Sequence, residues 1–210
     1  MKDVGVSQKY TTKDDEERGD QYAYLAIAAR EKLIISFYTG KRNFDSTGEF
    51  VGDLAERVPG RIQITSDSFR PYQSIVRKHL LGRLDFATMQ KIYATPYNMK
   101  AEATRRYAAP VCTGVRVRVQ AGAPRKDRIN TSFVERANLS VRHFNKRFGR
   151  LGLGWSRTLE NHRHAVTVFV CAHNFCKVHS TLGTTPAHGA KITDAPWTIE
   201  RLIDEATATN

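Results

Sequence analysis

Segments with the pattern of strands alternate along the chain with segments that have the pattern of helices, and this order limits the folds that the chain can adopt. Two short apolar and aromatic runs, Tyr22–Ile27 and Leu33–Phe37, are typical of buried strands. Apolar residues at helical spacing follow over 50–58, and the pattern stops at Pro59-Gly60. Next we predict a strand, a helix and a strand, over 61–66, 70–82 and 83–94. This succession indicates a mixed α/β fold in which helices flank the sheet.

The second half of the chain has a less regular pattern, which ends in helices. Residues 95–130 lack clear order, apart from the strand-like stretch "GVRVRVQ". Helices are expected over 132–148 and 156–178, followed by a loop and a short helix. Residues 1–19 lack apolar periodicity, so we expect a flexible leader before one domain that covers 20–210.

The apolar runs and the cysteines indicate the cellular compartment of the protein. No apolar run approaches the roughly 18 residues that a transmembrane helix needs. The first residues also lack the charged-then-apolar pattern of a signal peptide. The three cysteines are odd in number and show no paired spacing, so we expect reduced thiols in a cytoplasmic protein: Cys112, Cys171 and Cys176.

The charge of the chain is strongly positive. Lys and Arg number 33 against 21 Asp and Glu, which gives a net charge of +12. A polyanionic partner is favoured, because each neutralised phosphate releases condensed counterions. The alternative is a basic surface that is only solvated. Most of the charge lies between residues 100 and 150, where 13 basic and 3 acidic side chains leave +10.

Two stretches within this basic quarter indicate phosphate-binding surfaces. In "GVRVRVQ", alternation places Arg116 and Arg118 on one face of a strand. We expect the opposite face to pack against the protein through Val115, Val117 and Val119. The guanidinium groups would then meet successive phosphates.

The helix that follows Ser132 is the second basic stretch. Its core face is expected to contain Phe133, Ala137, Phe144 and Phe148. Spacing by four residues would align three basic side chains along another side, Arg142, Lys146 and Arg150. Together the two stretches and their neighbours supply ten predicted phosphate contacts: Arg116, Arg118, Arg125, Lys126, Arg128, Arg136, Arg142, Lys146, Arg147 and Arg150.

Two carboxylates lie where they suggest chemistry, and each also has a structural explanation. Asp67 follows a strand, and ligands gather at strand ends in α/β sheets. It can equally cap the helix that comes next. Glu135 fits the Ser-x-x-Glu capping box with Ser132, in which both side chains satisfy N–H groups of the first helical turn. Spacing alone leaves a metal-binding role open for both residues.

The stretch "CAHNFCKVH" suggests a zinc site through Cys171, His173, Cys176 and His179. A structural zinc ion needs four converging ligands, which usually come from two segments. On a helix, Cys171 and His173 point apart, so we favour a core role over zinc. Two further histidines, His162 and His164, are interpreted as polar helix residues or phosphate contacts.

The second half of the chain resembles DDE-type insertion-sequence transposases in three segments: "TSFVERANLSVRHFNKRFGRL", "LENHRHAV" and "HNFCKVHSTLGTTPAHGAKITDAPWTIERL". The first half resembles the same catalytic core in "GDQYAYLAI…KLIISFYTGKR" and "RIQITSDSFRPY…KIYAT", so the resemblance covers roughly residues 19 to 204. It implies a ribonuclease-H-like fold, three carboxylates that bind two Mg²⁺ ions, and DNA as the partner. A bacterial, nucleoid-associated protein that forms a homodimer or higher multimer is implied by analogy.

The resemblance assigns the second carboxylate to Asp67 and the third to Glu135. The first should follow the opening strand, where relatives have Ile-Asp-Ala and this chain has Ile27-Ala28-Ala29. Two metal ions repel each other, and carboxylates must offset that repulsion during in-line phosphoryl displacement. With Ala28 the carboxylate set falls from three to two, so we expect DNA cleavage and strand transfer to be absent or strongly impaired.

Other acidic residues near the opening strand do not replace the missing ligand. Asp20 lies at the far end of the strand and Glu31 lies beyond the following turn. We find no segment with the pattern of the family's usual N-terminal zinc or helix-turn-helix module, so we do not expect this chain to recognise a DNA site in that way. Three functions therefore stay open: a transposase core inactivated at Ala28 by engineering or natural loss, a domesticated DNA-binding protein, and a metal nuclease with an unrecognised third ligand.

Overall fold

The computed structural model describes residues 19–94, 111–148, 154 and 156–208. The leader predicted over 1–19, apart from Gly19, and Arg150 lie outside these residues. The chain divides into two compact units, of which the first combines Met1–Val58 with Ser132–Asn210 and the second is Pro59–Thr131. Both units contain strands and helices, so the expected mixed α/β class is confirmed.

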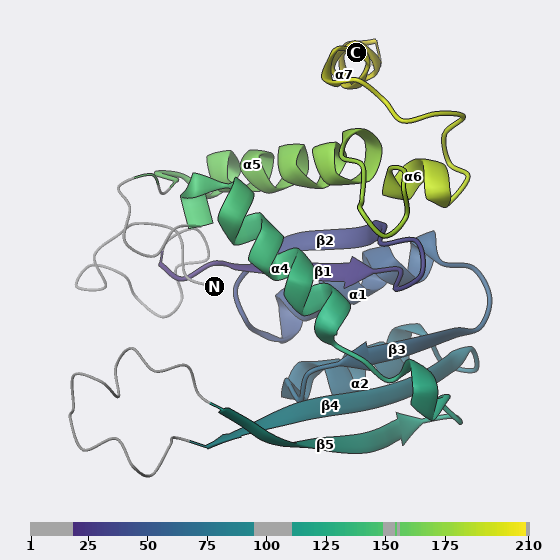
Figure 1. Ribbon diagram of the computed structural model, residues 1–210. Coiled ribbons are helices and arrows are strands. Elements are labelled where there is room, and N and C mark those ends of the chain that lie inside the picture. The colour runs from purple at the N-terminus through teal and green to yellow at the C-terminus, as the bar shows by residue number, and fades with distance from the viewer. Residues whose placement is uncertain (1–18, 95–110, 149–153, 155, 209–210) are drawn as a thin grey trace. The chain divides into compact units, whose positions relative to one another are not determined.

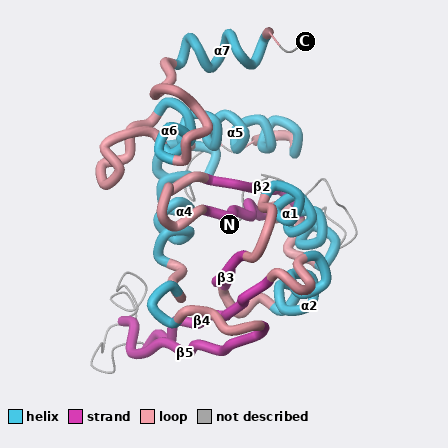
Figure 2. Tube along the Cα trace, turned by 90° about the vertical axis from the view of Figure 1, so that its right-hand side faces the viewer, coloured by secondary structure: helices cyan, strands magenta, loops and turns pink. Residues whose placement is uncertain are grey.

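An antiparallel hairpin forms the sheet of the first unit (Figure 1). Its strands are β1 (Tyr22–Ile27) and β2 (Ile34–Gly40), close to the predicted runs. Alternation gives the hairpin two faces. On one face the ring of Tyr24 lies 5.5 Å from that of Phe50 in α1 (Phe44–Arg57). Figure 2 shows the hairpin between α1 and α4 (Ser132–Phe144).

The other face of the hairpin packs on α4 and on α5 (Leu159–Cys171). Together they form the hydrophobic core of the first unit, which consists of Leu25, Ile34, Ala137, Val141, Phe148, Val166 and Val170. Each large apolar side chain that is buried in this way stabilises the fold by about 1.5–3 kcal/mol. The hairpin is therefore held from both sides by helices of its own unit.

Beyond α5 the chain of the first unit continues through a π-helical turn, η4 (Ala172–Cys176). Two short helices complete the unit, α6 (Pro186–Gly189) and α7 (Ile199–Thr207). None of the helices in the described part of the chain is both long and apolar enough to span a membrane.

A three-stranded mixed sheet forms the second unit, in the order β3-β4-β5. Strands β3 (Ile62–Ser66) and β4 (Leu84–Ala94) are parallel, and α2 (Arg70–His79) connects them. Strand β5 (Val111–Ala121) runs antiparallel to β4 at the edge of the sheet. A single 3₁₀ turn, η2 (Lys126–Arg128), follows β5.

The expectation that the valine face of β5 packs against the protein is wrong. Val115, Val117 and Val119 are 51%, 44% and 60% exposed. Strand β5 lies at the edge of its sheet, and α2 is the only α-helix among the described residues of this unit. Because side chains of α2 line a pocket with Arg116 and Arg118, this helix lies over the arginine face and leaves the valines uncovered.

Helix α4 ends earlier than predicted, and this removes one expected basic stripe. The side chain of Asn145 accepts the N–H of Arg147 at 3.1 Å, and a 3₁₀ turn, η3, covers Lys146–Phe148. Lys146 therefore does not continue the helical row that begins at Arg142. Of the predicted core residues, Ala137 and Phe148 are buried, Phe133 is half-buried, and Phe144 is 61% exposed, so that last assignment is wrong.

Candidate nucleic-acid interface

Ala28 lies in a tight turn directly after β1 in the first unit. Its N–H donates to the carbonyl of Leu33 at 2.8 Å, and its carbonyl accepts the N–H of Lys32 at 2.8 Å. Lys32 adopts a positive φ of 58° to close this turn. We call residues Ala28–Leu33 the Ala28 turn. The turn uses both backbone groups of Ala28, and its methyl side chain offers no ligand atom.

Lys32 is a basic residue of the Ala28 turn that the sequence analysis did not single out. Its Nζ lies 3.5 Å from the ring centroid of Phe133, in the first turn of α4, and it donates to the carbonyl of Ala29. Burial lowers the pKa of Lys32 below its ordinary value. Glu135 is exposed in the same helical turn as Phe133. An ammonium group is therefore held beside the start of α4, near the expected third carboxylate.

Further basic groups surround this part of the first unit. The pKa of His179 is lowered, first by burial and then by the positive charges of Lys32, Lys177 and Arg136. The Nζ of Lys177 lies 3.7 Å from the ring centroid of Phe144. These groups make the electrostatic environment positive, which disfavours a divalent cation unless several carboxylates accompany it.

Asp67 follows β3 in the second unit and is exposed. Its Oδ1 accepts the N–H of Phe69 at 3.1 Å, and Phe69 is the residue that precedes helix α2. Asp67 thus supports the start of α2, which is close to the capping role that the sequence left open.

The residues present do not fit a centre with two Mg²⁺ ions. Ala28 provides no oxygen ligand, which leaves two of the three carboxylates that the resemblance implies, Asp67 and Glu135. Within the described ranges, no three side chains among His, Cys, Asp and Glu are grouped so that they could hold a metal ion. The convergence of positions 28, 67 and 135 stays a prediction, and we derive no catalytic step through magnesium.

Arg116 and Arg118 lie side by side on one face of β5, as predicted. The β-sheet register places them opposite Gln90 and Thr88 of β4. Both arginines are exposed, and neither guanidinium group makes an ion pair or hydrogen bond with any described residue. This strand therefore presents two guanidinium groups without an internal anion.

The other predicted phosphate contacts differ in whether their side chains already have a partner within the protein. Arg125 forms an ion pair with Asp127 at 2.8 Å, which raises the pKa of Arg125 and lowers that of Asp127. Arg147 donates to the hydroxyl of Ser156 at 3.1 Å. Exposed side chains without such a contact remain at four of the predicted positions, Lys126, Arg128, Arg136 and Arg142. Lys146 is likewise exposed, in η3.

His162 is a core residue, so its interpretation as a polar surface residue or phosphate contact is wrong. Its side chain is fully buried, its ring centroid lies 4.7 Å from that of Phe148, and its Nδ1 is 3.4 Å from the Ser156 hydroxyl. Burial and the nearby charge of Arg147 lower its pKa to about 4. His164, two residues later, is exposed.

The stretch "CAHNFCKVH" ties η4 to the opening hairpin. The Asn174 side chain accepts the N–H of Ile34 at 3.0 Å and donates to the Ile34 carbonyl at 2.9 Å. The Nε2 of His173 lies 3.0 Å from the Lys32 carbonyl. All three cysteines are free, and burial raises the pKa of Cys171. These contacts give the stretch the structural role that we favoured.

Comparisons with known proteins give no family assignment. No family model, curated protein or solved structure matches the chain. The residues and their geometry therefore carry the functional inference.

Proposed function

We propose that the protein is a DNA-binding protein of the DDE-transposase type, in which metal-dependent strand cleavage is lost or strongly impaired. The observation that carries this proposal is the pair of exposed arginines on β5, Arg116 and Arg118, which have no partner among the described residues. A guanidinium group presents donors in a planar fork that matches phosphate oxygens. Residues two apart on a strand are about 7 Å apart, so both can contact one phosphate backbone.

Lost cleavage follows from the first carboxylate position. Ala28 contributes no charge or oxygen, and the ammonium of Lys32 is held beside the neighbouring start of α4. Two Mg²⁺ ions would there lack one of the three carboxylates that the resemblance requires. The protein would therefore hold DNA without the metal ions that activate the attacking oxygen.

A ribonuclease-H-like arrangement and a multimeric state belong to the same proposal. The element order, with two strands followed by helix, strand, helix and strand, supports this arrangement, as does the parallel pairing of β3 with β4. Transposases of this type act on paired DNA ends, so a homodimer or higher multimer is proposed by analogy. Light scattering after gel filtration, with and without duplex DNA, measures that state.

Fluorescence anisotropy with a labelled 30-base-pair duplex tests the DNA-binding proposal. We expect the affinity to fall steeply and linearly on a plot of log Kd against log salt, because bound phosphates release counterions. Replacing Mg²⁺ by EDTA at constant ionic strength should leave the affinity within about two-fold, since the phosphate contacts are made by arginines. An absence of binding at 50 mM salt, or binding that requires Mg²⁺, would contradict the proposal.

A further inference from the structure

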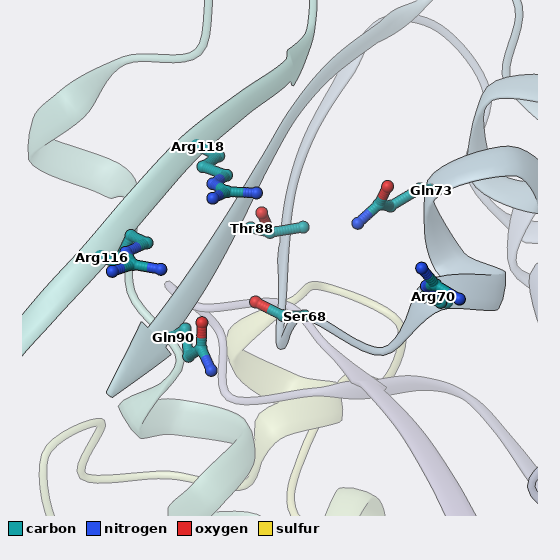
Figure 3. Close-up of a pocket in the computed structure, with 7 residues that line it drawn as sticks. All are labelled: Ser68, Arg70, Gln73, Thr88, Gln90, Arg116 and Arg118. Atoms are coloured by element: carbon teal, nitrogen blue, oxygen red, sulfur yellow. The ribbon is translucent and has the colours of Figure 1, made fainter. Parts of the chain in front are cut away.

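A pocket of about 240 Å³ opens in the second unit beside the start of helix α2 (Figure 3). Three arginines line it: Arg70 from the first position of α2, and Arg116 and Arg118 from β5. No Asp or Glu lines it. We call this hollow the arginine pocket. Its lining brings together three segments of the chain, the start of α2, β4 and β5.

Uncharged donors complete the lining of the arginine pocket, from Ser68, Gln73, Thr88 and Gln90. In Figure 3 the Arg118 guanidinium extends from β5 toward Thr88, and Gln73 extends from α2 toward the same space. Thr88 is only 2% exposed, and its hydroxyl oxygen accepts the Gln120 amide at 3.2 Å. That contact leaves the Thr88 hydroxyl proton available for a further acceptor.

The arginines of the pocket are held differently from other arginines of the same unit. Arg61 donates to Asp85 at 2.7 Å, and Arg125 pairs with Asp127. The guanidinium groups of Arg70, Arg116 and Arg118, by contrast, make no ion pair or hydrogen bond within the described part of the chain. Three neighbouring cations without an anion repel one another, so an anionic ligand in the pocket would relieve this repulsion.

The start of α2 favours an anion for a separate reason. The first turn of this ten-residue helix contains no acidic side chain, and Phe69 provides no side-chain cap. Instead, a positive charge, Arg70, stands at the first helical position, where the helix dipole is also positive. The Asp67 carboxylate already accepts the N–H of Phe69 just before the helix, and a second anion bound beside Arg70 would compensate the remaining positive charge.

We propose that the arginine pocket binds one phosphoryl group of a nucleic-acid strand. Guanidinium, amide and hydroxyl groups together supply the charge-assisted hydrogen bonds that phosphate oxygens accept. The volume is several times the roughly 30 Å³ that one water molecule occupies, which leaves room for a phosphoryl group and part of the attached sugar. The assignment of the phosphoryl group to a nucleic acid rests on the proposed function. The ability of the pocket to bind a phosphoryl group rests only on its own side chains.

Arginine side-chain NMR of the full chain tests this site directly, with inorganic phosphate as the probe at constant ionic strength. We expect saturable shifts of the Nε–H signals of Arg70, Arg116 and Arg118, while the signal of Arg57, which is paired with Asp53, does not change. Gln73→Glu places a carboxylate in the pocket without a change of size, and should weaken phosphate binding at least about ten-fold. Asn161→Asp makes the same amide-to-carboxylate change on α5, outside the pocket, and should leave binding unchanged.

Competition by DNA separates this inference from the proposed function. A short duplex should displace phosphate from the wild-type pocket. Phosphate binding that duplex DNA does not compete with would retain the phosphoryl site but overturn its nucleic-acid source. Linear shifts of equal size at Arg57, or no effect of Gln73→Glu on phosphate binding, would overturn the pocket even where salt-dependent DNA binding persists.

The position of the phosphoryl group in the strand follows from one more comparison. Competition by a single-stranded oligonucleotide with a 5′-phosphate is measured against the same oligonucleotide with a 5′-hydroxyl. Equal competition supports an internal phosphodiester as the ligand, whereas competition at least about ten-fold stronger by the 5′-phosphate supports a strand end, since a terminal phosphate has the greater charge. Failure of both oligonucleotides to compete would contradict a nucleic-acid ligand.

Discussion

Two basic regions of the molecule hold their cations in opposite ways. In the first unit, Lys32 and Lys177 lie over the rings of Phe133 and Phe144. In the second unit, the arginines on β5 have neither a ring nor a carboxylate as a described partner. Positive charge that the protein itself satisfies contributes to folding, whereas positive charge left unsatisfied is available to a ligand. The number of basic residues alone does not make this distinction.

The largest expected effect concerns the Ala28 turn. Ala28→Asp restores a third carboxylate, and we expect Mg²⁺-dependent nicking of supercoiled DNA to rise more than roughly 100-fold above the starting protein. The matched control is Ala29→Asp, which adds the same charge one residue later. Equal activity of both variants, or none in either, would favour a domesticated DNA-binding protein whose site has changed beyond position 28.

Acid should destabilise the first unit through buried His162. The unfolded residue takes up a proton near pH 6.5, whereas the folded residue does so only near pH 4, so stability is lost as pH falls from 6.5 toward 4. Urea unfolding at pH 7.5 and 5.0 should differ by about 2 kcal/mol from this residue alone. His162→Gln should reduce the difference by that amount, and an unchanged difference would show that His162 is not buried.

Protonation of His173 should also destabilise the fold as pH falls, because burial lowers the pKa of this residue as well. The His162→Gln variant should therefore keep part of the pH dependence. Complete loss of pH dependence in that variant would contradict the burial of His173 in η4.

Asn174→Ala should lower the free energy of unfolding by about 2 kcal/mol, because the buried backbone groups of Ile34 lose their side-chain partner. Chemical denaturation measures the change. Asn161→Ala, on the exposed surface of α5, provides the control and should change stability by less than about 0.5 kcal/mol. A similar small change for Asn174→Ala would remove the structural role assigned to this stretch.

The smallest effect is expected for the lysines of the first unit. Lys177→Met removes a cation over the ring of Phe144, which is worth about 0.5–1 kcal/mol at an exposed site. DNA affinity should change by less than about two-fold, since this charge is already satisfied within the protein. A drop in affinity as large as that for a β5 arginine would remove the distinction between the two regions.

Element order was accessible from the sequence because it depends on local apolar patterns. The predicted run Tyr22–Ile27 matches β1 residue for residue, and Pro71 lies in the first turn of α2, as its position in the sequence indicated. The predictions that were wrong concern features that depend on contacts between residues far apart in the sequence. The valines of β5 have a strand pattern, but they stay exposed because α2 lies over the opposite face, the one that presents the arginines.

The candidate sites show the same division. The arginine alternation on β5 was readable, since Arg116 and Arg118 are two residues apart. Arg70 was missed because the pocket joins it to β5 only through the fold, although an arginine at a helix start without an acidic neighbour was an available signal. His162 was assigned to the surface because its polar type does not reveal the packing of Phe148 against it.

DNA affinity of two charge-matched double variants tests the central claim most directly. Arg116→Gln with Arg118→Gln removes two unpaired guanidinium groups, while Arg57→Gln with Arg201→Gln removes two that contact carboxylates. By anisotropy at 50 mM salt, the first pair should weaken binding by roughly 10- to 100-fold and reduce the salt slope by about 2. The second pair should change affinity by less than about three-fold. Equal losses in both pairs would contradict the account, because net charge alone would then explain binding.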